Sequence, residues 1–300
     1  MRSFIKYVIC KSKLKYWRLI GRANEIPDEE YLRVLYCVMV KQIPNFRVPR
    51  TFNEKIQWLK LYDRRIEYTK MVDKYEVKKY VAGIIGETYI IPTLGVWNSL
   101  KEINYSDLPK RFVLKCTHNS GGVVIIRDKN TIDYDYLERK LGKELNINYY
   151  YYNREWPYKD VKPRIIAEKY MEDNSNDLKD YKVHCFNGVP RFIQVIGNRK
   201  LEKHSGNQLF YDFDWKDVGW AFGDYPPYNY KLEKPYGLSE MYDVASKLSR
   251  GTRYLRVDLY EINQKVYFGE LTFYPKAGFY PYNKYYKYDT DLFLGSLISL

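Results

Sequence analysis

Apolar residues recur every three or four positions over the first part of the chain, which is the spacing of one face of an α-helix. Basic residues lie between them. The positions that carry this pattern are Phe4, Tyr7, Val8, Leu14, Trp17, Tyr31, Val34, Leu35 and Val38. The sequence therefore predicts a helical, basic N-terminal region over residues 1–68.

A different pattern begins after a boundary that we expect near residues 67–70. The segment MVDKYEVKKYVAGIIGETYIIPTLGVW carries an apolar stripe at helical spacing, and Gly86 suits the end of that helix. YIIP and GVW are typical of strands, as are the later runs FVLKC, VVIIR, RIIAEKYM and VHCFNG. This alternation indicates an α/β or α+β fold. Residues 172–180 form the most loop-like tract.

The stretch RVDLYEINQKVYFGELTFYP, residues 256–275, predicts a tight β-hairpin that places two acids face to face. With a three-residue loop of Asn263, Gln264 and Lys265, counting back along the strands pairs Asp258 with Glu270 and Arg256 with Thr272. Like charges directly opposite each other destabilise a sheet, and a divalent cation reverses that effect.

Two carboxylates and a nearby hydroxyl suit Mg²⁺, which prefers oxygen ligands and often completes its shell with phosphate oxygens. The predicted metal residues are therefore Asp258, Glu270 and Thr272. The alternative is an ordinary solvated hairpin face, because a one-residue slip in register removes the pairing.

A second group of residues lies in RFVLKCTHNSGGVVIIRD, where a strand ends in Lys115 and a loop of residues 117–122 follows. Backbone N–H groups of such a loop can surround a phosphate, because Gly121 and Gly122 permit close approach and positive φ. The Walker A and G-x-G-x-x-G spacings are absent. A plain hairpin turn with a surface lysine is the alternative. His118 also lies in this loop, as a phosphate contact or as a structural residue.

A third group offers Glu168 after an apolar strand and Lys182 on the next one. The carboxylate can accept a ribose hydroxyl and the lysine can bind phosphate. Each residue taken alone is equally compatible with a surface charge.

Composition narrows the classes of protein. Of the 300 residues, 45% are hydrophobic and 18% aromatic, which is enough for a large core, and a net charge of +13 favours anionic partners. The 34 tyrosines are interpreted as a reflection of genome composition rather than a base-stacking surface. Four scattered cysteines predict reduced, mostly buried thiols. No run approaches the roughly 18 apolar residues of a membrane span, and no signal peptide is evident, so we expect a cytosolic protein.

Three other function classes remain to be weighed. A glycosyltransferase using Asp212 and Asp214 of YDFDW as a D-x-D metal site is the nearest competitor, although a loop role for these acids is expected more often. A nucleic-acid binder is not expected, because no recognised module is present and acids are interspersed with the bases. Hydrolase and zinc chemistry have little support, since His118, His184 and His204 show no ligand spacing.

The segment KYVICKSKLKYWRLIGR near the N-terminus fits a basic amphipathic helix. Such a helix can lie on the anionic inner face of a membrane. It can also pack on the catalytic core, which is the more frequent arrangement.

Taken in order, these groups of residues resemble the ATP-grasp superfamily, and most closely its TupA-like polysaccharide-biosynthesis branch. The resemblance runs from about Thr51 to the end of the chain. The matching stretches are FNEKIQWLKLYDR, VDKYEVKKYV, FVLKCTHNSGG, IAEKYM, DYKVHCFNG, RVDLY and FGELTFYPKAGF, with LGSLISL as a weaker addition.

The resemblance implies an α+β ATP-grasp fold, in which two subdomains clasp ATP and a glycine-bearing hairpin closes over its phosphates. Residues 69–167 would form the first subdomain and residues 168–300 the catalytic one. By position, the residues near ATP would be Lys74, Lys115, His118, Ser120, Gly121, Gly122, Glu168 and Lys182, with Glu168 at the hinge beside adenine and ribose. Asp258, Glu270 and Thr272 would carry Mg²⁺. Arg256 and Lys182 would be catalytic, with Arg256 neutralising charge on the transferred phosphoryl group.

The resemblance also implies a reaction: phosphorylation of a substrate carboxylate, followed by attack of an amine on the acyl phosphate to form an amide. The partners would be a carboxylate on a glycan or sugar carrier, in bacterial capsule or related polysaccharide synthesis, and an amine donor. Two features depart from the pattern. Thr272 stands where the superfamily usually has Asn as a third metal ligand, and the first 50 residues replace the α/β domain that often precedes the core.

Overall fold

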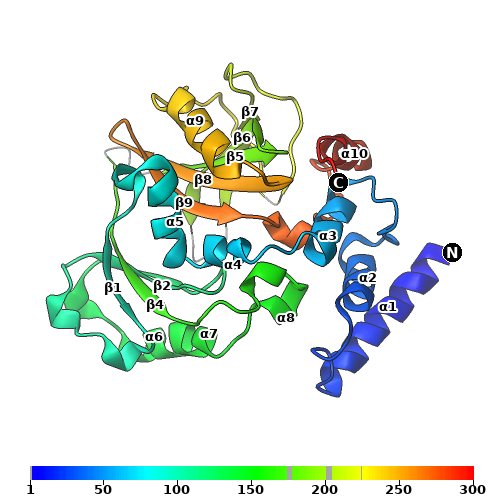
Figure 1. The fold of residues 1–300 in the computed structure, drawn as a ribbon, viewed down its shortest axis with the longest axis horizontal. Coiled ribbons are helices and arrows are strands. Elements are labelled where there is room, and N and C mark those ends of the chain that lie inside the picture. Colours follow the sequence, from blue (N-terminus) through cyan, green and yellow to red (C-terminus); the bar gives the residue numbers. More distant parts are fainter. Residues whose placement is uncertain (1, 174–177, 201–204, 224) are drawn as a thin grey trace.

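The computed structural model describes residues 2–173, 178–200, 205–223 and 225–300. Figure 1 shows two sheets lying one above the other, with helices at the N-terminal end extending away from them. The helices are α1 (Arg2–Leu19), α2 (Asp28–Val40), α3 (Phe52–Tyr62), α4 (Glu67–Val72), α5 (Glu76–Ile85), α6 (Tyr134–Leu137), α7 (Lys143–Leu145), α8 (Tyr150–Asn153), α9 (Leu238–Ser249) and α10 (Tyr288–Ser296). The strands are β1 (Thr93–Trp97), β2 (Phe112–Cys116), β3 (Val123–Ile126), β4 (Ile165–Lys169), β5 (Asp180–Phe186), β6 (Val189–Lys200), β7 (Ser205–Tyr211), β8 (Tyr254–Ile262) and β9 (Lys265–Thr272). Helices beside antiparallel sheets make this an α+β fold, as predicted.

The N-terminal region is helical, as the apolar spacing predicts. Helix α2 begins with three acids that favour a helix N-terminus, and α3 begins with a capping box of Thr51 and Glu54. Buried residues of α1 and α2 share a core with Ala277 and Phe279, which follow the last strand. The region is therefore joined to the rest of the chain by a common core.

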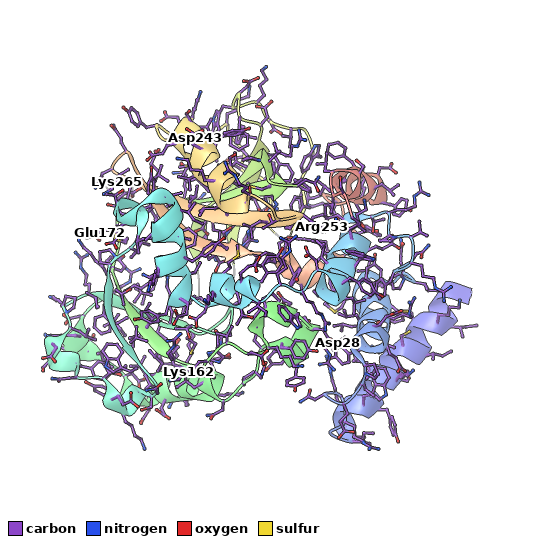
Figure 2. All side chains as sticks on the ribbon, viewed as in Figure 1. Asp28, Lys162, Glu172, Asp243, Arg253 and Lys265 are labelled. Carbon is purple, nitrogen blue, oxygen red and sulfur yellow. The ribbon has the colours of Figure 1, made fainter. Side chains whose placement is uncertain are left out.

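Asp28, at the start of α2, ties this region to the middle of the chain (Figure 2). Its carboxylate accepts a hydrogen bond of 2.6 Å from Arg64 and one of 2.5 Å from the Tyr150 hydroxyl. Arg154 lies 3.1 Å from the same carboxylate and is almost fully buried. These contacts fix α2 against α8.

The smaller sheet has the order β1-β4-β2-β3, with antiparallel pairing throughout. Strand β2 alternates buried and half-buried positions, so one face closes a core with Leu137 and Leu141. All of β4 belongs to this sheet, since Glu168 pairs with Thr93 and Val113. A division between residues 167 and 168 therefore falls inside a strand, and a boundary after Lys169 fits the pairing better.

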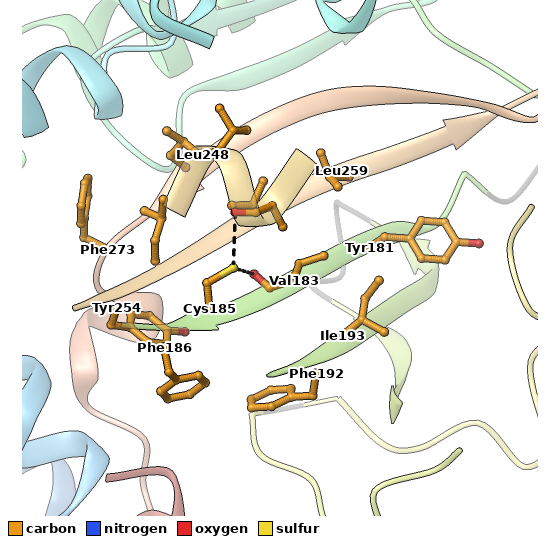
Figure 3. Packing of buried hydrophobic residues seen from close by; sticks show 14 of the residues in the cluster. Tyr181, Val183, Cys185, Phe186, Phe192, Ile193, Leu248, Tyr254, Leu259 and Phe273 are labelled. Atoms are coloured by element: carbon orange, nitrogen blue, oxygen red, sulfur yellow. Dashed lines mark hydrogen bonds between the residues drawn. The ribbon is translucent and has the colours of Figure 1, made fainter. Parts of the chain in front are cut away.

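The larger sheet has the order β7-β6-β5-β8-β9, and α9 covers one face of it. Figure 3 shows the buried side chains on this sheet, among them Val183, Cys185 and Leu259. Ile90 forms an isolated bridge with Phe268 of β9, so the segment leading into β1 contacts the edge of the larger sheet. The predicted strand at YIIP, residues 89–92, is therefore reduced to this single bridge.

The cysteines, the absence of a predicted membrane span and the predicted loop can be compared with the structure. Cys10, Cys37, Cys116 and Cys185 are free, and all except Cys10 are buried. In the described parts of the chain, no helix is both long and apolar enough to span a membrane. The predicted loop at residues 172–180 falls partly outside the described residues, and β5 begins at its last position.

Candidate active site

The hairpin of β8 and β9 pairs Asp258 with Glu270 and Arg256 with Thr272, as predicted. The predicted three-residue loop is wrong. Asn263 and Gln264 alone form the turn, with φ of 51° and 64°, and Ile262 pairs with Lys265. A bulge at Gly269 then adds one residue to β9 and restores the predicted register. A Cβ atom at Gly269 would lie 3.0 Å from the carbonyl oxygen of Asp258, which explains the glycine.

A guanidinium group lies between the two opposed acids. Arg256 donates to Asp258 through Nε at 2.6 Å and Nη2 at 2.8 Å, and Nη2 also contacts Glu270 Oε1 at 3.2 Å. The Thr272 hydroxyl accepts from Arg256 at 3.0 Å and donates to Glu270 Oε1 at 3.1 Å. The cation compensates the like charges and orders the three side chains around itself.

Lys182 brings a second cation from the neighbouring strand. It stands opposite Asp258 in the pairing of β5 with β8, and its ammonium group binds Asp258 Oδ2. Asp258 is only 3% exposed. Burial alone would raise the pKa of its carboxyl, but Arg256 and Lys182 outweigh burial and hold that pKa below its usual value. Asp258 is therefore a buried anion that positions two cations.

Glu270 has the oxygen best suited to a metal ion. Its side chain is 44% exposed, and within the described ranges its hydrogen bonds use Oε1, which leaves Oε2 open. The neighbouring Thr272 hydroxyl is a further hard oxygen ligand. Asp258 has both oxygens engaged by cations, although each carboxylate oxygen has a second lone pair. This donor set fits Mg²⁺ with part of its shell supplied by water or phosphate. No third acid, histidine or cysteine joins it among the residues described.

The smaller sheet contributes a separate charged group. Glu168 at the end of β4 binds Lys115 of β2 and Lys78 of α5, each at 2.5 Å. Burial would raise the pKa of Glu168, but the two lysines together lower it. The structure thus brings together the predicted Lys115 and Glu168. Lys78 was not predicted; it lies in the first turn of α5, four residues after the predicted Lys74.

Glu168 makes a pH-dependent contribution to stability that Glu168→Gln should remove. Because the folded pKa is lowered, this contribution is complete above pH about 4.5 and is lost as pH falls through the lower folded value. We expect the variant to be less stable by about 1–3 kcal/mol at pH 7, since glutamine keeps only a neutral acceptor. Denaturant unfolding between pH 7 and pH 3 should show this difference shrinking in acid; a difference independent of pH would contradict the assignment.

Lys74 lies in the turn before α5 and contacts the glycine loop of residues 117–122. Its ammonium group donates to the carbonyl oxygen of Asn119, and its backbone N–H donates to Thr117 at 3.1 Å. Burial lowers the pKa of Lys74, while Glu270 on the larger sheet acts to raise it and Lys115 on the smaller sheet to lower it. Charges on both sheets therefore act on the Lys74 ammonium group.

The glycine loop differs from its prediction. Neither Gly121 nor Gly122 has positive φ. The backbone N–H groups of both donate to Asn119 Oδ1, at 3.3 and 3.1 Å, so the loop closes on its own asparagine instead of presenting these donors. Gly122 is needed for space, because a Cβ atom there would lie 2.8 Å from Cys116 Sγ.

Two other residues of this loop, His118 and Ser120, contact the segment of residues 144–149. The His118 ring is buried, and Nε2 lies 3.0 Å from the carbonyl oxygen of Glu144. Burial lowers the pKa of this imidazole, which is the environment of a structural histidine. Ser120 is exposed and donates to the Tyr149 hydroxyl at 2.8 Å. Of these two side chains, that of Ser120 is therefore more accessible to a ligand than that of His118.

The YDFDW segment forms a turn after β7. Asp212 Oδ1 accepts the backbone N–H groups of Asp214 at 3.0 Å and Lys216 at 2.8 Å, which closes the turn. Asp214 is exposed beside Lys216. This is the loop role that the sequence favours for these acids. Of the remaining histidines, His184 is buried against the Tyr254 hydroxyl at 2.8 Å, and His204 lies outside the described residues.

The family model described as TupA-like ATPgrasp matches residues 54–299. No curated protein matches the chain. Among solved structures, a D-alanine–D-alanine ligase from Bacillus anthracis complexed with ATP is 18% identical, with a TM-score of 0.39, over 67% of this chain and 53% of its own length. The enzyme of the same name from Helicobacter pylori is 17% identical, with a TM-score of 0.44. The match covers 82% of this chain and 69% of the length of that enzyme.

A third solved structure is the ATP-grasp ligase PsnB with minimal precursor, Mg and ADP. It is 10% identical, with a TM-score of 0.37, over 88% of this chain and 64% of its own length. The chain thus spans between about half and two thirds of the length of these proteins.

Proposed function

The chain belongs to the TupA-like ATP-grasp family, and from this premise we propose that it is an ATP- and Mg²⁺-dependent carboxylate–amine ligase of cell-surface polysaccharide biosynthesis. Its α+β architecture is that of an ATP-grasp enzyme. The observation that carries the proposal is the arrangement on the larger sheet, where an open carboxylate oxygen of Glu270 lies beside two cations held by Asp258.

ATP would bind between the two sheets. Lys115 and Lys74 would contact its phosphates or the adenine side, and Glu168 would lie at the hinge near adenine and ribose. The ion pairs of Glu168 with Lys78 and Lys115 support this, because they hold the carboxylate in one orientation at the end of β4. Ser120 would add a hydroxyl from the glycine loop.

Glu270, Asp258 and Thr272 would hold Mg²⁺. When bound, the metal supplies charge neutralisation at the phosphate oxygens. Glu270 offers the accessible ligand atom, and the Thr272 hydroxyl lies 3.1 Å from the same carboxylate. A neutral hydroxyl in place of the family's usual amide makes the third position the weakest of the three.

Arg256 and Lys182 would act on the transferred phosphoryl group. Both are held by the buried Asp258 carboxylate, so they are positioned before a ligand arrives. Prepositioned cations cost little reorganisation when charge develops in the transition state. The contribution of the protein would be positioning and electrostatic stabilisation.

The proposed reaction balances in two steps. A substrate carboxylate oxygen attacks the γ-phosphorus of ATP, giving an acyl phosphate and ADP. An amine nitrogen then attacks the acyl carbon, the C–O bond to phosphate breaks, and the amine proton passes to solvent. The products are an amide, ADP and inorganic phosphate. The acceptor would be a carboxylate on a glycan or sugar carrier. We place the reaction in the cytosol.

ADP release tests this proposal. The enzyme is incubated with ATP and Mg²⁺ against a panel of uronic-acid glycans or sugar nucleotides, each with and without an amino acid. We expect ADP release to depend on both partners, and mass spectrometry to find a product equal to the two partners minus water. Sugar transfer without nucleotide turnover would contradict the ligase proposal.

A further inference from the structure

Helix α1 has a mainly apolar face that the rest of the protein leaves uncovered, with Ser12 as its one polar position among the described side chains. Leu14 and Trp17 are buried against α2, and the Trp17 ring stacks on Tyr31 with ring centroids 6.2 Å apart. Cys10 packs against the same core. The opposite side of the helix is nevertheless mainly apolar as well. Its exposed apolar residues are Ile5, Val8, Ile9, Tyr16 and Leu19.

The exposed apolar residues form a stripe on one face of the helix, interrupted by Ser12 between Ile9 and Tyr16. At about 100° per residue, these five positions fall within a sector of about 100°, and the buried positions lie on the other side of the helix. Ile5, Ile9 and Leu19 are 52%, 58% and 80% exposed. Isolated exposed apolar residues need no explanation, but five of them on one face of an 18-residue helix mark an interaction surface.

Cations border this stripe on both sides. Helix α1 contains six Lys or Arg residues and no Asp or Glu. Lys6 and Lys13 project at one edge of the stripe, and Lys11, Lys15 and Arg18 project at the other, by the same helical geometry. All five are exposed, and of these Lys13 pairs with an acid, Glu30 of α2. Long lysine side chains can extend from an apolar surface to a charged layer above it.

Figure 1 places α1 at the outer edge of the molecule, away from both sheets. A flat surface can therefore approach α1 without meeting the sheets. The helix is too charged to span a bilayer, and no described helix qualifies as a span. A stripe of apolar side chains between two rows of cations matches the boundary between acyl chains and anionic headgroups.

We propose that α1 is a membrane-surface helix, which inserts Ile5, Val8, Ile9, Tyr16 and Leu19 into an anionic lipid bilayer while its lysines bind the headgroups. The partner is an anionic phospholipid surface, chosen because the helix is purely cationic and its free face is apolar. The inference is independent of the ligase chemistry, since it rests on none of the site residues.

Vesicle flotation of the full chain tests the proposal, with phosphatidylglycerol-containing vesicles compared against pure phosphatidylcholine. We expect binding to the anionic vesicles, and a loss of at least about tenfold in the partition coefficient for Ile5→Gln/Ile9→Gln/Leu19→Gln. Lys6→Gln/Lys11→Gln/Lys15→Gln should lose a similar amount and weaken the salt dependence, because three of the six cations of α1 are removed.

Matched controls change similar residues elsewhere. Ile66→Gln/Ile84→Gln/Val189→Gln removes three exposed apolar side chains, and Lys101→Gln/Lys231→Gln/Lys265→Gln removes the same charge at exposed sites. Lys265 lies at the far end of the molecule from α1 (Figures 1 and 2). Both controls should bind as the parent chain does. Absence of binding by the parent, equal loss in the controls, or binding to neutral vesicles alone would overturn the proposal. So would self-association in solution that the apolar α1 variant abolishes.

Discussion

Replacing Glu270 by alanine is expected to reduce ADP release at least about a hundredfold while leaving the protein folded. The activity should fall because this carboxylate offers the open oxygen for Mg²⁺, and losing one well-placed electrostatic group costs roughly 10²–10³ in rate. The stability should change by less than about 1 kcal/mol, because the side chain is half-exposed and its ion pair with Arg256 is screened by water. Steady-state ADP release and thermal unfolding measure the two effects separately.

Glu29→Ala is the matched control for this variant. Glu29 is similarly exposed and also pairs with an arginine, Arg33, at 2.8 Å, but it lies on α2. We expect that control to retain full activity. Unchanged turnover in Glu270→Ala would remove Glu270 from the site.

Asp258→Ala is expected to have the largest effect on stability, a loss of about 3–5 kcal/mol, and to abolish turnover as well. The substitution removes the anion shared by two largely buried cations, Arg256 and Lys182. Among the acids of the described residues, Arg256 then keeps only its contact with the half-exposed Glu270, and Lys182 keeps only Asp180 at 4.0 Å. Removing one partner of a buried ion pair is strongly destabilising. Denaturant unfolding at pH 7 measures the loss. Asp258 and Glu270 thus face each other on adjacent strands yet should respond differently, one mainly in stability and the other mainly in activity.

A double variant tests the cause of that instability. Adding Lys182→Met to Asp258→Ala removes one of the two cations that have lost the Asp258 carboxylate, so we expect part of the lost stability to return. If the two changes were simply additive, or if Asp258→Ala cost less than about 1 kcal/mol, Asp258 would not be the anion that holds this cluster.

The sequence predicted the pairing of Asp258 with Glu270 correctly, although it predicted the wrong turn length and no bulge. The alternation of residues sets which side chains share a face, and this placed Asp258 and Glu270 together. The turn is one residue shorter than predicted, and a bulge at Gly269 that was not predicted adds one residue to β9, so the two errors cancel. Glycine within a strand is the signal for such a bulge.

Other parts of the site depend on contacts between distant segments, which a local pattern does not contain. Asn119 closes the glycine loop through its own side chain, and Lys78 becomes a partner of Glu168 only when α5 meets β4. Lys60 looks like a surface lysine of α3, yet it is fully buried and donates to the carbonyl oxygen of Ala277 at 2.6 Å. Burial lowers its pKa to about 7, with Glu155 acting in the opposite direction.

The proposed function requires acids on adjacent strands to bind a metal ion together with the phosphates of ATP. Anomalous diffraction from crystals grown with Mn²⁺ and a non-hydrolysable ATP analogue tests it most directly. The expected result is a manganese peak at coordination distance from Glu270 and the phosphate oxygens, with Lys182 and Lys115 facing the nucleotide. A peak at Asp212 and Asp214, or a nucleotide bound away from both lysines, would contradict the account.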